Sequence, residues 1–279
     1  MPIALRSIVR QKTTIILTGM ILLLALGGFF VYQRFMISDI SEVAVDEIDL
    51  SFDPEGPFAI LTPRRDGNAL ILNLKRTASY DKISYELAYN SEGIDRGVMG
   101  EINAEEKKGE YEQEILFGTC SKNVCKYDKD VENGTLILHI RKGSEAFRMI
   151  TQWRLQKPDV VLGKLVSGDG HFAYNINPQD SSLTKIGFSI INDLTGAPKL
   201  LPGKAVFGKV YTVNVPLAKN LPEGEITLEL SEAPSESGKL FRFDDGKNEW
   251  VALETSASGD KVSGKSESGG IFAVLIDQQ

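Results

Sequence analysis

Apolar and polar residues alternate in short runs along most of the chain after residue 45. A period of two is typical of half-buried strands, whose successive side chains point to opposite faces. Outside residues 13–32, no segment keeps a helical period for three turns. The clearest predicted faces consist of Ile83, Tyr85, Leu87 and Tyr89, and of Tyr111, Ile115 and Phe117.

Turn sequences separate these runs at close intervals, and this pattern predicts an all-β chain built from antiparallel sandwiches. The predicted turns, which contain residues that tolerate positive φ, are Asp53-Pro54-Glu55-Gly56, Asp66-Gly67, Asn133-Gly134, Asp169-Gly170 and Asp245-Gly246. The last of these predicts a closing hairpin with Leu240, Trp250 and Leu253 in its core.

The predicted organisation is two tandem antiparallel β-sandwich (Ig-like) domains after one N-terminal transmembrane helix. Pro158 follows a strand-like run that ends near Leu155, so we place the boundary there. The first sandwich is then residues 46–157 and the second is residues 158–279, each close to the common domain size.

Residues 13–32 form a run of twenty residues without a charge, long enough for a helix to cross a bilayer. Basic residues lie on its N-terminal side, so the positive-inside rule predicts a signal anchor. Residues 1–12 are then a cytoplasmic tail, residues 33–45 a tether, and the rest of the chain is extracytoplasmic. A cleaved signal peptide and a buried core helix are the alternatives.

Charge is distributed unevenly along the chain. Four of the 31 basic residues and none of the 38 acidic ones precede Ser38, so the remainder carries 27 basic residues and a net charge of −11. Such a surface repels nucleic acid and anionic lipid. We therefore expect no nucleic-acid partner.

Cys120 and Cys125 are the chain's two cysteines, and they lie in FGTCSKNVCKYD. They could be zinc ligands with His139, but a fourth ligand is missing because His171 lies far along the chain. A redox pair usually has two residues between its cysteines beside a helix N-terminus, which this stretch does not offer. Outside the cytoplasm the pair is expected to form a disulfide, with free thiols as the next alternative.

Residues 259–266 match the phosphate-binding pattern G-x-x-x-x-G-K-[ST]. That loop works only between a buried parallel strand and a helix, whereas a strand-like run follows Ser266. We therefore expect no bound nucleotide. We also expect no other cofactor and no metal. Replacing Lys265 with Ala should leave any activity unchanged.

Catalytic motifs are scarce. His139 and His171 are the only histidines, and no nucleophile elbow accompanies them. Carboxylates are numerous but no particular pair stands out. The acidic residues Asp46, Glu47, Asp49, Asp53 and Glu55 lack the spacing of a calcium loop and are interpreted as a solvated face.

The tripeptide Asn133-Gly134-Thr135 matches a glycosylation acceptor. It also matches a two-residue hairpin turn between the cysteine loop and the following strand. We prefer the turn.

The run from ISYELAYNSEGIDRGVMGEI through EILFGTCSKNVCKYD to GTLILHIRKG resembles uncharacterised single-pass exported β-sandwich proteins of small-genome candidate-phyla bacteria. In those proteins a Gly-Thr/Ser-Cys-Ser loop with a second nearby cysteine precedes a strand. The resemblance covers the first predicted β domain. It implies a bacterial source and an envelope location, and it implies no activity.

These observations predict a membrane-anchored extracytoplasmic module of the bacterial cell envelope that is structural or binds a partner and is not an enzyme. Its expected contacts are the membrane, through the N-terminal helix, and an envelope protein or glycan. The alternative is an envelope glycan hydrolase, which would need two facing carboxylates in a cleft. A membrane sensor is a third hypothesis, although the short tail leaves little room for an output domain.

Overall fold

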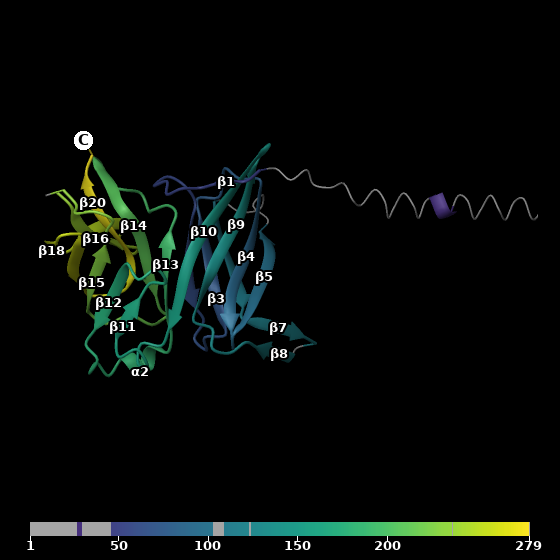
Figure 1. Cartoon of the computed structure of the whole chain (residues 1–279), viewed down its shortest axis with the longest axis horizontal. Helices are drawn as coiled ribbons and strands as arrows, with labels where there is room; N and C mark the ends of the chain where they lie inside the picture. The colour runs from purple at the N-terminus through teal and green to yellow at the C-terminus, as the bar shows by residue number, and fades with distance from the viewer. Residues whose placement is uncertain (1–26, 30–45, 103–108, 123, 236, 279) are drawn as a thin grey trace, which may run out of the picture. The chain divides into compact units, whose positions relative to one another are not determined.

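The computed structural model describes residues 27–29, 46–102, 109–122, 124–235 and 237–278 (Figure 1). The chain divides into two units, Met1–Asp46 and Glu47–Gln279. The predicted membrane helix lies outside the described residues except for residues 27–29, which are helical, and the predicted tail and tether lie outside them as well. Across the described ranges, no helix is long and apolar enough to span a bilayer.

The second unit is all-β, and its largest component is a ten-stranded sheet. Neighbouring strands along it are antiparallel, and β1 (Ile48–Asp49) pairs in parallel with β10 beside the main path. From edge to edge the strands are β17 (Glu249–Ala252), β16 (Lys239–Asp244), β20 (Gly270–Asp277), β14 (Lys204–Asn214), β13 (Ser189–Leu194), β10 (Glu145–Gln156), β9 (Asn133–Lys142), β4 (Lys82–Ser91) and β5 (Ile94–Ile102).

Three smaller sheets accompany it, together with the short helix α2 (Leu183–Ile186). The five-stranded sheet consists of β11 (Lys164–Val166), β12 (Phe172–Ile176), β15 (Gly224–Glu229), β19 (Lys261–Ser266) and β18 (Thr255–Ser258). The three-stranded sheet consists of β2 (Phe58–Pro63), β3 (Ala69–Lys75) and β6 (Glu110–Leu116), and the two-stranded sheet consists of β7 (Gly118–Ser121) and β8 (Val124–Tyr127).

The three-stranded sheet packs against the half of the large sheet that contains β4, β9 and β10. Leu61, Leu72 and Ile115 of the small sheet share one hydrophobic core with Leu87 and Trp153 of the large one. Both faces predicted from the alternating runs lie against this core. Burying one face of each sheet against the other is the sandwich arrangement that the period of two predicts.

The five-stranded sheet packs on the opposite face of the large sheet. Adjacent residues of β13 show this, because Ile190 belongs to the first core while Ile191 packs with Phe172 and Tyr174 in a second one. Successive residues of a strand point to opposite faces. The three-stranded and five-stranded sheets therefore cover opposite faces of the large sheet, each toward a different end of it.

Strand β20 is buried on both of its faces. Phe272 and Val274 point into the second core, whereas Ile271 and Ala273 point into a third. The third core also holds Phe241, Phe243 and Trp250 of the closing hairpin β16–β17, which turns after Asp244 as predicted. Of the residues expected in the core of that hairpin, Leu240 and Trp250 are buried and Leu253 is partly buried.

The predicted boundary at residues 157 and 158 falls between β10 and β11. Strands from both sides of this boundary belong to the same sheet, because β10 pairs with β13 over Trp153–Gln156. A period of two shows that a strand is half-buried but not which strand it pairs with. The sequence therefore missed the shared sheet, and the division into two domains stays a prediction.

The chain enters this unit along the edge of β10. Asp49 of β1 accepts two hydrogen bonds from the Arg148 guanidinium, at 2.7 and 3.0 Å. One residue before β1, Glu47 lies 2.8 Å from Nδ1 of His139 on the outer face of β9. Two of the acidic residues expected to form a solvated face thus pair with basic side chains of the sheet.

Candidate functional site

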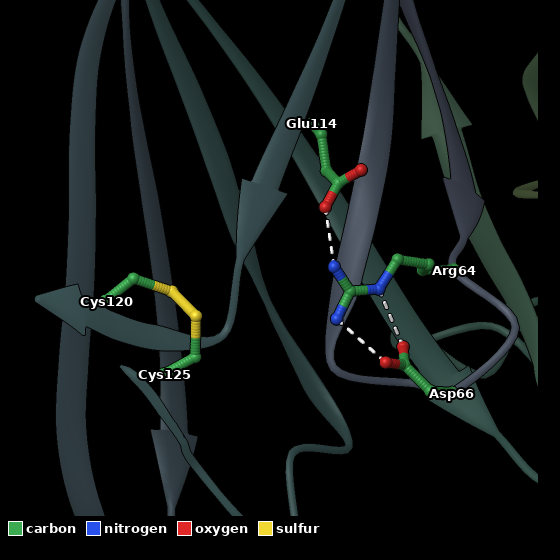
Figure 2. The surroundings of a disulfide bond; sticks show 5 residues. All are labelled: Arg64, Asp66, Glu114, Cys120 and Cys125. Carbon is green, nitrogen blue, oxygen red and sulfur yellow. Dashed lines mark hydrogen bonds and ion pairs between the residues drawn. A yellow bond between two sulfur atoms is a disulfide. The ribbon is translucent and has the colours of Figure 1, made fainter. Parts of the chain in front are cut away.

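Strands β7 and β8 form a hairpin that extends away from the large sheet (Figure 1). Cys120 and Cys125 are directly opposite each other in its register, and their sulfurs lie 2.02 Å apart (Figure 2). This geometry fits the predicted disulfide. The described residues from Cys120 to Lys126 are exposed, and Val124 near the tip is 72% exposed.

The base of this stapled hairpin is fixed to the first core. Phe117, which immediately precedes β7, is fully buried and contacts the rings of Tyr89 and Trp153 at centroid distances of 5.0 and 5.6 Å. Asp128, which follows β8, donates its backbone N–H to the Phe117 carbonyl and accepts a 2.8 Å hydrogen bond from the Tyr89 hydroxyl. Both ends of the hairpin are therefore held.

Arg64, which immediately follows β2, contacts the hairpin from the side. Its guanidinium donates two hydrogen bonds to Asp66, at 2.7 and 2.8 Å, and one to Glu114 of β6 at 2.6 Å (Figure 2). The same guanidinium lies over the ring of Tyr127 at 5.5 Å from its centroid. Hydrogen bonding to Arg64 lowers the pKa of Asp66, so this clamp stays ionised across the physiological range.

The charges of the stapled hairpin are all positive. Between Gly118 and Tyr127 the sequence contains Lys122 and Lys126 and no acidic residue, although the whole chain has a net charge of −7. Together with the apolar tip at Val124, this makes a rigid, basic and partly apolar projection. An acidic protein surface would be complementary to this projection in charge.

The strongest cluster of ionisable groups lies elsewhere, where the turn between β11 and β12 meets β13 and β14. Lys209 donates to Asp169 at 2.9 Å and lies 3.5 Å from Asp193, and the Tyr211 hydroxyl also donates to Asp169, at 2.8 Å. A register shift in β14 between Phe207 and Tyr211 precedes this arrangement. Bulges of this kind commonly redirect side chains near functional sites.

The protein itself uses the hydrogen-bonding capacity of both carboxylates. Asp169 also accepts from the Ser167 hydroxyl at 2.5 Å and from the backbone of His171 at 3.2 Å, and Asp193 accepts from the backbone of Gln152 at 2.7 Å. Burial opposes the ionised form of Asp169, but these hydrogen bonds outweigh it and lower its pKa to about 2. Burial raises the pKa of Asp193. The cluster resembles a structural ion network more than an acid–base pair.

The other sequence candidates are spread over the fold. Residues 261–266 of the phosphate-binding pattern form antiparallel strand β19, and the next element is strand β20, so no helix follows the pattern. His171 lies in the turn before β12 and His139 in β9. Within the described ranges, no three His, Cys, Asp or Glu side chains gather to hold a metal ion.

The prediction of a turn at Asn133-Gly134 is wrong. These residues begin β9 and pair with Arg154 and Trp153 of β10. A Cβ on Gly134 would lie 2.1 Å from the Ala88 carbonyl oxygen and 2.5 Å from the Trp153 ring. The glycine therefore permits close packing inside the sheet, a need that the dipeptide does not distinguish from that of a turn.

Sequence reasoning located the disulfide but missed its support. Arg64 lies 56 positions before Cys120, and no local pattern connects it with Tyr127. The sequence signal for the basic character of the hairpin was the absence of acidic residues between the two cysteines. Comparison of the chain with protein-family models, with curated proteins and with solved structures found no match.

Proposed function

We propose that this chain is a membrane-anchored extracytoplasmic binding module of the cell envelope, without a catalytic role. The observation that carries the proposal is the stapled hairpin, with its buried base and its exposed, basic tip. The uncharged segment 13–32 and the charge asymmetry around it support the anchor.

The stapled hairpin has the physical character of a recognition element. A two-stranded hairpin is marginally stable by itself in water, yet here a disulfide and the Arg64 clamp hold a segment that buries little. Rigidity of this kind lowers the entropy lost on binding. The expected partner is an acidic envelope protein, because Lys122 and Lys126 are the hairpin's only charged residues.

The geometry offers less support to a glycan hydrolase. A hydrolase needs one carboxyl group that protonates the leaving oxygen and another that attacks or activates water. Asp169 and Asp193 are two carboxylates that share Lys209 as a partner, and both accept hydrogen bonds from protein groups. A role in holding the fold together therefore accounts for the position of these two carboxylates.

Site-specific photo-crosslinking in the native envelope tests the proposal. A photoreactive residue at Val124 should give one discrete product with an acidic protein, whereas the same residue at Leu217, which is 68% exposed, should not. The product should weaken when Cys120 and Cys125 are both replaced by Ser. Equal products from the two positions, or none from position 124, would contradict the proposal.

A further inference from the structure

A second surface, independent of the stapled hairpin, lies on the outer face of β9 and β10. It is a hollow of about 270 Å³ lined by Asn133, Gly134, Thr135, Gln152, Trp153, Arg154 and Gly168. On this half of the large sheet the inner face is buried, and the outer face has no sheet against it in the described structure. The hollow lies where the five-stranded sheet begins.

Strand register arranges four polar side chains around the hollow. Asn133 pairs with Arg154 and Thr135 pairs with Gln152, on either side of the Gly134–Trp153 pair. Because Trp153 points into the core, its neighbours Gln152 and Arg154 point outward. The four side chains frame an area of about 5 by 7 Å, given the usual strand spacing and rise.

These four side chains are uncommitted. In the described structure none of them has a hydrogen-bond or ion-pair partner, and Arg154 is the only charged residue that lines the hollow. Trp153 is also part of the lining, but its indole is fully buried and points into the first core. The four outward side chains, with one cation among them, therefore remain available to a ligand that brings hydrogen-bond acceptors.

The ion network holds one wall of this hollow in place. Gly168 precedes Asp169 in the turn before β12, and Lys209 and Tyr211 bind Asp169. On the other side, Asp193 accepts the backbone N–H of Gln152. The network thus supports the hollow through Gly168 and the backbone of Gln152, while the Gln152 side chain remains uncommitted and faces the hollow.

We infer that the hollow binds one carboxylate-bearing sugar residue of an acidic glycan. A guanidinium matches a carboxylate with two parallel hydrogen bonds, and the amides and hydroxyl of Asn133, Gln152 and Thr135 suit ring hydroxyls. One cation among neutral groups fits a single carboxylate better than a doubly charged phosphate. Nearby Asp169 and Asp193 also disfavour a second negative charge.

A larger cavity continues on the other side of Arg154. It measures about 550 Å³, and Arg154 is part of its lining together with Asp128, Asp130, Glu132 and Lys157. Its carboxylates can accept hydrogen bonds from neutral sugar hydroxyls but would repel further acidic groups. The glycan that fits both cavities therefore has an acidic residue next to neutral ones.

The test is a binding titration of the full chain in a detergent without a sugar headgroup. Ligand-observed NMR with sodium glucuronate should show saturable binding, and glucose, acetate and inorganic phosphate should each bind more weakly. Glucose lacks the carboxylate and acetate lacks the hydroxyls. The contributions of the carboxylate and of the ring hydroxyls to binding are thereby measured separately.

Arg154→Gln should weaken glucuronate binding about tenfold or more, because a charge-assisted pair is lost. Arg154→Lys should bind with an affinity between the two, and Arg65→Gln, the same charge change at an exposed arginine outside the hollow, should bind like the original chain. The melting temperature should not change in Arg154→Gln, since Arg154 has no protein partner. Unchanged glucuronate binding in Arg154→Gln, equal affinity for glucose, tighter binding of phosphate, or no saturable glucuronate binding would each overturn the inference.

Discussion

The two halves of the ten-stranded sheet differ in how many of their faces are covered. In the half around β20, Phe272 and Val274 pack on one face while Ile271 and Ala273 pack on the other. In the half with β4, β9 and β10, one face is buried and the other carries the polar hollow and exposed Ile150. The same sheet thus serves as a central layer at one end and as an open surface at the other.

Under the proposed binding role, this difference separates the residues that stabilise the sheet from those that contact a partner. A strand buried on both faces has no side chains left for a partner, whereas a strand buried on one face has half of them. The hollow lies on the open face of that half, and the base of the stapled hairpin is anchored in the core on its other face. Three predictions test this separation, in order of decreasing effect.

Phe272→Ala should destabilise the protein most. Phe272 is fully buried in the second core, and removing a buried aromatic ring costs about 3–5 kcal/mol. Ile150→Ala on the open face, where the side chain is 41% exposed, should change the free energy of unfolding by less than about 0.5 kcal/mol. Urea denaturation of both variants measures the contrast, and equal losses would show that the two halves do not differ as described.

Asp169→Asn should have an intermediate effect that depends on pH. Its folded pKa of about 2 lies below the ordinary value of 3.8, so the ionised form contributes stability above pH 4 and loses it as the pH falls toward 2. At pH 5 the variant should be less stable by about 2 kcal/mol. At pH 2 the difference should shrink; a difference independent of pH would mean that the charge of Asp169 does not matter.

Replacing both Cys120 and Cys125 with Ser should cost the least, at most about 2 kcal/mol, because the bridge closes a very small loop. Amide hydrogen exchange should accelerate in β7 and β8 while the exchange of β9 and β10 stays slow. This result is expected because Phe117 and Asp128 hold the base independently of the disulfide. Faster exchange throughout the first core would instead show that the disulfide stabilises the whole sandwich.

The alternation of apolar residues predicted strands and their buried faces well. Ile83, Tyr85, Leu87 and Tyr89 are all buried on β4, and the turn after Asp244 joins the hairpin expected there. The same alternation could not predict that strands from both predicted domains share one sheet. Strand pairing depends on residues far apart in the sequence, and a pattern within one strand does not encode its partner.

The candidate sites show the same division. The cysteines were identifiable because their chemistry and their spacing are local. The hollow was not, because Asn133 and Arg154 meet only through the register of β9 and β10, and because Asn133-Gly134 suggested a turn. The ion network likewise joins Asp169, Asp193 and Lys209 from three separate elements.

The sequence by itself determined the all-β class, the buried face of each clear strand, the uncharged segment near the N-terminus and the cysteine pair. Each of these depends on residues that are neighbours in the chain, through period, charge or spacing. Only the tertiary structure decided which face of the large sheet remains open and which polar groups remain uncommitted there. Those properties depend on strand order and register, which bring together residues that the chain keeps far apart.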